Sequence, residues 1–135
     1  MITPVIFQIE DDEDFAFFMQ CAIKEIDNDI TVTILANGKV GMETLYTYQE
    51  LKQLPKLILL DLELPGISGI EILKIIRAIP DFDKIPVVLF STSNNPRHVR
   101  SAQEFGANEY QVKPLGYLSL VNSLKLMHIN YININ

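Results

Sequence analysis

Side chains suited to phosphoryl chemistry follow short apolar segments at separate points of the sequence. Glu10 and Asp11 follow one such segment, and Asp61 follows another. Ser91 ends a third, and Lys113 stands directly before a proline. A carboxylate can attack a phosphoryl group to form an acyl phosphate, and such transfer is catalysed mostly by positioning and charge neutralisation. Carboxylates also bind Mg²⁺, an ammonium supplies a compact positive charge, and a hydroxyl donates to a phosphoryl oxygen.

The elements that must position these residues alternate between short apolar runs and longer amphipathic segments. The predicted strands are residues 5–9, 30–35, 57–60, 87–90 and 108–112. The predicted helices are residues 12–26, 40–51, 70–79, 96–105 and 115–127. Five strands that are each followed by a helix predict an α/β fold with a doubly wound parallel sheet.

The reactive side chains all stand at carboxyl ends of predicted strands. In a parallel α/β sheet the ligand lies beyond those ends, near the point where the strand order reverses. Each side chain also has an ordinary interpretation. An acidic run before a helix often caps that helix, a strand-end aspartate is often a turn residue, and a lysine before proline is usually solvated. The agreement of four strand ends on one sheet edge favours a functional site.

Length, composition and charge bound the class of protein. The 135 residues fit a single domain, with an expected core over residues 4–127 and a tail at 128–135. The hydrophobic fraction of 48% is sufficient for a buried core. The net charge of −6, with only scattered basic residues, argues against a nucleic-acid partner, because duplex binding needs a basic stripe.

The sequence also bears on the compartment. Cys21 is the only cysteine, which excludes an intrachain disulfide and is compatible with the cytosol. The N-terminal residues lack a basic region followed by an apolar stretch, and no apolar run approaches the roughly 20 residues of a membrane span. We therefore expect a cytoplasmic protein with no membrane partner.

Four segments of the sequence are similar to the receiver domain of two-component response regulators. They are residues 9–12, 59–69, 87–93 and 110–114, and the resemblance covers about residues 4–127. Counted from Asp61, Ser91 lies 30 positions on, Tyr110 lies 49 and Lys113 lies 52, as is usual in that family. The resemblance implies a flavodoxin-like fold with five helices and a five-stranded sheet in the order 2-1-3-4-5.

The resemblance also implies a chemical role for each matched residue. Asp61 would accept a phosphoryl group from a phosphohistidine on a sensor histidine kinase. Glu10, Asp11 and Asp61 would hold Mg²⁺ together with the backbone carbonyl of Glu63, with Asp11 as the more direct ligand of the acidic pair. Lys113 would pair with the phosphoryl group. Such a chain catalyses its own phosphorylation and dephosphorylation, but it is a signalling switch rather than a conventional enzyme.

Two further residues would convert phosphorylation into a signal. Ser91 would hydrogen-bond the phosphoryl group, and Tyr110 would pack inward behind it as the switch aromatic. The change would alter the surface formed by the fourth helix, the fifth strand and the fifth helix, which would bind a downstream protein, a phosphotransfer protein or a second copy of the chain. The family also implies a cis Lys113-Pro114 bond that aims the lysine inward.

The sequence departs from the family pattern near the acceptor. Glu10 replaces the commoner, shorter aspartate, and Thr92 stands where a smaller residue is common. Glu63 and Ser93 lie at positions that tune dephosphorylation, so we expect Glu63→Ala and Thr92→Ala to change the rate of phosphoryl decay.

Three other functions compete with the switch. A receiver-like binding module would signal without phosphorylation, although the full set of acidic, hydroxyl and lysine residues argues against it. A phosphatase with an aspartyl-phosphate intermediate would commonly place its nucleophile near the first strand, whereas Asp61 follows the third. A flavin protein would need a hydroxyl- and glycine-rich loop after the first strand, where this chain has five consecutive acids.

Overall fold

A central parallel sheet organises the chain in the computed structural model, which describes residues 3–133. Its strands are β1 (Ile6–Ile9), β2 (Val32–Leu35), β3 (Leu57–Asp61), β4 (Val87–Ser91) and β5 (Glu109–Val112). Every neighbouring pair is parallel, and the order is β2-β1-β3-β4-β5. The predicted doubly wound sheet and its strand order are therefore confirmed.

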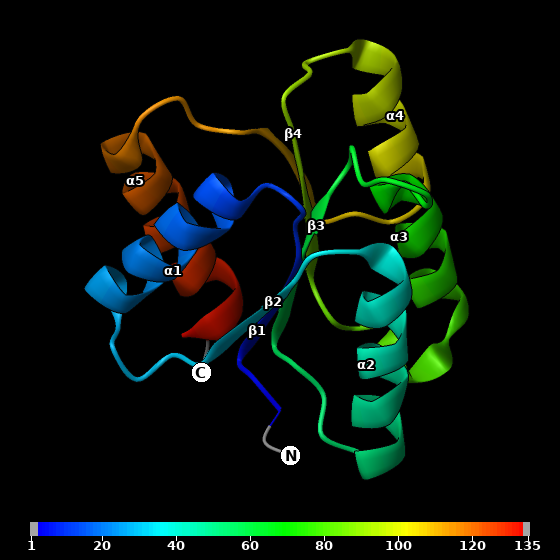
Figure 1. The fold of residues 1–135 in the computed structure, drawn as a ribbon. Coiled ribbons are helices and arrows are strands. Elements are labelled where there is room, and N and C mark those ends of the chain that lie inside the picture. The colour runs from blue at the N-terminus through cyan, green and yellow to red at the C-terminus, as the bar shows by residue number, and fades with distance from the viewer. Residues whose placement is uncertain (1–2, 134–135) are drawn as a thin grey trace.

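Helices cover both faces of this sheet, with α1 and α5 on one side and α2, α3 and α4 on the other (Figure 1). Their bounds are α1 (Glu13–Ile26), α2 (Gly38–Leu51), α3 (Gly69–Ala78), α4 (Pro96–Glu104) and α5 (Tyr117–Met127). A short 3₁₀ turn, η1 (Pro80–Phe82), follows α3. A π-helical turn, η2 (His128–Ile132), continues α5. The tail predicted at 128–135 thus extends the last helix, and its residues 134–135 lie outside the described part of the chain.

The three central strands are buried along their whole length, as expected of strands covered on both faces. Side chains alternate between the faces. The face toward α1 and α5 carries Ile6, Leu57, Leu59, Val88 and Phe90. The face toward α2, α3 and α4 carries Phe7, Ile9, Ile58, Leu60, Val87 and Leu89. The sheet therefore separates two apolar cores.

The same alternation sorts the candidate site residues between the two faces. Glu10, Asp61 and Lys113 are in phase with the strand residues that face α1 and α5. Ser91 and Tyr110 are in phase with the opposite face, and Tyr110 packs against the core there. Of the helices in the described part of the chain, none combines the length and the apolar character that crossing a bilayer requires.

Candidate functional site

Three carboxylates meet at the carboxyl ends of β1 and β3. Glu10 continues the β1 ladder, because its N–H donates to the Leu35 carbonyl at 2.9 Å. Glu10 and Asp61 are each only 2% exposed, whereas Asp11 is exposed. One oxygen from each of Glu10, Asp11 and Asp61 lies within 4.8 Å of the others. The structure thus brings together the three acids that the sequence proposed as metal ligands.

The acidic run after β1 divides into two functions. The Asp12 carboxylate accepts hydrogen bonds from the N–H groups of Asp14 (3.0 Å) and Phe15 (3.2 Å), so it caps α1. The Asp12 N–H donates to Glu10 Oε2 at 3.1 Å, which holds the buried glutamate in place. The capping interpretation is therefore correct for Asp12, while Glu10 and Asp11 contribute to the pocket.

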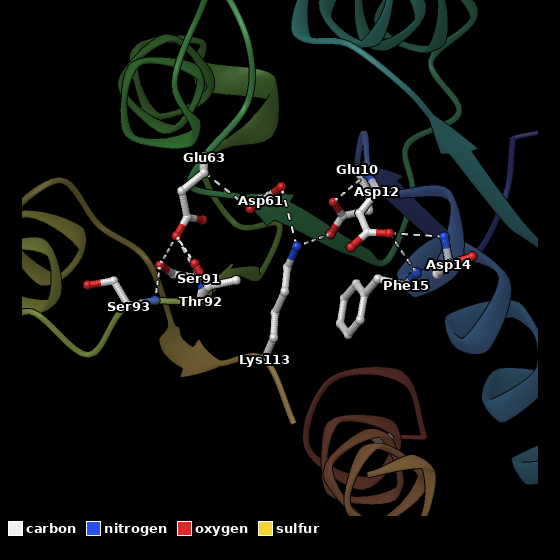
Figure 2. Close-up of polar contacts among 10 residues, drawn as sticks. All are labelled: Glu10, Asp12, Asp14, Phe15, Asp61, Glu63, Ser91, Thr92, Ser93 and Lys113. Carbon is white, nitrogen blue, oxygen red and sulfur yellow. Dashed lines mark hydrogen bonds and ion pairs between the residues drawn. The ribbon is translucent and has the colours of Figure 1, made fainter. Parts of the chain in front are cut away.

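Lys113 reaches the carboxylates from the end of β5 (Figure 2). Its Nζ lies 2.9 Å from Glu10 Oε1 and 3.4 Å from Asp61 Oδ2. Burial lowers the pKa of Lys113, but its contacts with Glu10 and then Asp61 outweigh that effect, so the pKa lies above its ordinary value. The Phe15 ring centroid lies 4.8 Å from Nζ. This aromatic contact was not predicted, because Phe15 fits the ordinary apolar pattern of α1.

The prediction of a cis Lys113-Pro114 bond is wrong, because every described peptide bond is trans. Trans is the lower-energy form of an X-Pro bond by about 0.5–1 kcal/mol. The lysine already points inward without the cis form. The backbone N–H of Lys113 donates to the Ser91 carbonyl at 2.8 Å, which extends the β4–β5 ladder. The lysine side chain therefore leaves the strand toward the acids.

The carboxylate pocket carries more negative charge than Lys113 neutralises. Burial, followed by the hydrogen bond and charge of Glu10, raises the pKa of Asp61 to about 8, although Lys113 acts in the opposite direction. Glu10 Oε1 is buried, and its close contact is the ion pair with Lys113. A divalent cation would offset the remaining charge, and an all-oxygen donor set suits Mg²⁺. The residues present therefore fit the expected metal.

A second group of contacts lies beside Asp61 and involves Glu63, Ser91 and Thr92. The Ser91 hydroxyl donates to Glu63 Oε1 at 2.5 Å, and the N–H and hydroxyl of Thr92 each donate to the same oxygen at 3.0 Å. Burial alone would raise the pKa of Glu63, but hydrogen bonds from Ser91, Asp61 and Thr92 lower it overall. These carboxylate contacts were not predicted. The Glu63 backbone N–H donates to Asp61 Oδ1 at 3.1 Å. The expected binding of a metal ion by the Glu63 carbonyl stays a prediction.

Tyr110 is linked to this group through the loop after β4. Its hydroxyl donates to the Ser93 carbonyl at 2.5 Å, and the Ser93 N–H donates to Ser91 Oγ at 2.9 Å. Tyr110 is partly buried against the core beneath α4. The hydroxyl and the aromatic residue that the sequence assigned to a switch are therefore connected by two hydrogen bonds.

Gly69 sets how closely α3 approaches the acceptor strand. A Cβ on Gly69 would lie 3.0 Å from both the Asp61 carbonyl carbon and Leu62 Cα, and closer still to the Asp61 carbonyl oxygen. The Gly69 N–H donates to the Leu62 carbonyl at 3.1 Å. Only glycine fits here, so Gly69 determines how closely the start of α3 packs against the backbone that carries Asp61.

The chain is similar in sequence to known signalling proteins. The sequence model of the response regulator receiver domain matches residues 6–125. The response regulator Rcp1 of Synechocystis sp. (strain ATCC 27184 / PCC 6803 / Kazusa) is 36% identical over 111 residues, which cover 81% of this chain and 76% of that protein. The probable methanogenesis regulatory protein FilR2 of Methanothrix harundinacea (strain 6Ac) is 29% identical over 122 residues, which cover 90% of this chain and 79% of that protein.

Two solved structures are similar over nearly the whole chain. The Mn²⁺-bound form of response regulator Rcp1 has a TM-score of 0.81 at 27% identity, and the match covers 98% of this chain and 97% of that one. The phosphorylated cyanobacterial phytochrome response regulator RcpA has a TM-score of 0.87 at 28% identity, and the match covers 97% and 95%.

Proposed function

The chain belongs to the response regulator receiver family of two-component systems, and from this premise we propose that it is a phosphorylation switch with Asp61 as acceptor. The observation that carries the proposal is the meeting of Asp61 with two further acids and Lys113 at one sheet edge. The receiver domain has its core over residues 4–127. The alternative function, a phosphorylation-independent binding module, does not require buried acids and a lysine at this sheet edge.

The proposed reaction transfers a phosphoryl group from the phosphohistidine of a sensor histidine kinase. An Asp61 carboxylate oxygen attacks phosphorus, so that a P–O bond forms while the P–N bond to the imidazole breaks. The released imidazole takes up a proton. Lys113, whose Nζ lies 3.4 Å from Asp61 Oδ2, neutralises charge on the transferred group. Phe15 and Glu10 hold that ammonium beside the acceptor.

Glu10, Asp11 and Asp61 would hold a Mg²⁺ ion together with the Glu63 carbonyl. When bound, the ion supplies further charge neutralisation at the phosphoryl oxygens. The proximity of the three carboxylates supports this assignment. The similar structure of Rcp1 contains Mn²⁺, and the similar RcpA structure is phosphorylated, which supports both parts of the proposal.

The output would pass from Ser91 to Tyr110 and then to the surface of α4, β5 and α5. Ser91 would turn its hydroxyl to the phosphoryl group, and the hydrogen-bonded path through Ser93 connects that movement to Tyr110. The altered surface would bind a downstream protein, a phosphotransfer protein or a second copy of the chain.

Phosphorylation in vitro tests the proposal directly. The chain is incubated with acetyl phosphate and Mg²⁺, and intact mass spectrometry counts added phosphoryl groups. We expect one group on the wild type and none on Asp61→Asn or when EDTA removes the metal. Asp12→Asn is the matched control, because asparagine also caps helices and Asp12 lies outside the pocket. An unmodified wild type, or a modified Asp61→Asn variant, would refute the proposal and favour the binding module.

A further inference from the structure

One oxygen of the Glu63 carboxylate lies at the centre of a donor cradle made by Ser91 and Thr92 (Figure 2). The cradle consists of the Ser91 hydroxyl, the Thr92 N–H and the Thr92 hydroxyl, at 2.5, 3.0 and 3.0 Å from Glu63 Oε1. Three donors that converge on a single anionic oxygen form an oxyanion site. In this chain, a side chain of the protein supplies the anion.

The cradle lies beside the acceptor. Phe90, which precedes Ser91, is the register partner of Asp61 across β3 and β4. The Glu63 N–H donates to Asp61 Oδ1 at 3.1 Å, so the residue whose carboxylate fills the cradle also contacts Asp61.

A phosphoryl group on Asp61 would need the same donors. It carries about two negative charges and three strong acceptor oxygens. Lys113 stands on the opposite side of Asp61 from the cradle, beside Glu10 (Figure 2). The Glu63 carboxylate and a phosphoryl oxygen cannot both accept from the Ser91 hydroxyl, because it has one proton to donate and the two anions repel each other.

We propose that the Glu63 carboxylate is an internal surrogate for the phosphoryl group, which occupies the cradle until phosphorylation of Asp61 displaces it. This inference deepens the proposed function and rests on it. The Ser91 hydroxyl is already bound to an anion, and the same hydroxyl accepts from the Ser93 N–H. Phosphorylation therefore exchanges one anion for another in a formed site, and Glu63 is released toward solvent.

Competition for the cradle predicts tighter binding of a phosphoryl analogue when Glu63 loses its charge. The probe is beryllium trifluoride with Mg²⁺, titrated by fluorine NMR. We expect Glu63→Gln and Glu63→Ala to bind it about tenfold more tightly than the wild type, the factor expected for losing one competing charge-assisted hydrogen bond. Glu50→Gln, which makes the same charge change on the exposed end of α2, should match the wild type. Equal affinity in all variants, or weaker binding by Glu63→Ala, would overturn the surrogate role.

A second readout does not depend on phosphorylation. The Thr92 amide proton is bonded to a carboxylate in the metal-free chain, so its proton NMR resonance should move upfield in Glu63→Ala and stay in place in Glu50→Gln. An unmoved Thr92 resonance would show that Glu63 does not fill the cradle. If Thr92 responds but the wild type and every variant fail to bind the probe, the proposed function fails while the Glu63 contact stands.

Discussion

Replacing Asp61 with asparagine should stabilise the metal-free chain, although it removes the proposed acceptor. Asp61 is buried beside Glu10, and these two causes raise its pKa from 3.8 to about 8. An asparagine has the same shape and no charge. Its carbonyl oxygen can accept from the Glu63 N–H, as Asp61 Oδ1 does, and its amide can donate to Glu10. The variant therefore avoids the cost of an acid that folding buries.

The size of this effect follows from the pKa difference between the unfolded and folded states. A pH of 7 is about three units above the pKa of 3.8 of the unfolded Asp61 carboxyl, which is therefore ionised. The same pH is below the pKa of about 8 in the folded chain, where the carboxyl keeps its proton. Each unit corresponds to about 1.4 kcal/mol, so the upper bound is about 4 kcal/mol. The asparagine NH2 group would also face the Lys113 ammonium, which lies 3.4 Å from Asp61 Oδ2, and two donors facing each other cancel part of this gain. We therefore expect a net stabilisation of about 2–4 kcal/mol.

The sign of the pH dependence is specific. Because the folded pKa lies above the unfolded value, the cost is absent below about pH 4, grows as the pH rises and levels off above about pH 8. Urea unfolding in EDTA at pH 5 and pH 7.5 measures the gap between wild type and Asp61→Asn, which should widen with pH. Mg²⁺ should raise the stability of the wild type more than that of the variant. A gap that is equal at both pH values, or a less stable variant at pH 7.5, would refute the reasoning.

Two further predictions concern backbone fit and alkaline stability. Gly69→Ala should lower the free energy of unfolding by about 1–3 kcal/mol, because the new methyl group meets the Asp61 backbone, whereas Gly116→Ala, with open space around it, should stay within about 0.5 kcal/mol. Urea unfolding of both variants checks this, and equal loss would contradict it. Burial and a hydrogen bond to Glu109 raise the pKa of Tyr131, so this tyrosine contributes stability that is present below about pH 10 and is lost as the pH rises further. Thermal melts from pH 8 to 11 should show a shallower decline for Tyr131→Phe, and parallel curves would count against the assignment.

The fold was predictable because its periodicity is strong. The buried central strands appear in the sequence as apolar runs, and predicted element bounds differ from the observed ones by at most two residues, as at the start of β2 and of α2 and α5. Helix ends depend on caps that a periodic pattern does not locate. The Asn37 side chain, for example, accepts from the Val40 N–H and starts α2 two residues before the predicted position.

The candidate site was predictable where position along a strand determines it. Glu10, Asp61 and Lys113 had to meet, because carboxyl ends of parallel strands share one edge. The contacts of Glu63 with Ser91 and Thr92 were not predictable, because they depend on the path of two loops and on a side-chain rotamer. The trans bond before Pro114 shows the limit of resemblance, since a family habit did not transfer to this chain.

The candidate site residues are distributed over the two faces of the sheet, and this affects how the sequence can evolve. Glu10, Asp61 and Lys113 belong to the α1 and α5 side, while Ser91 and Tyr110 belong to the side of α4. Glu63 joins these two sets through its contacts with Ser91 and Asp61, whereas substitutions in contacts well separated from them act almost independently. Residues on the outer surface of α4 can therefore diverge toward new partners while selection preserves the acidic pocket. After gene duplication, one copy of this chain could therefore gain a different binding partner while its acidic pocket stays unchanged.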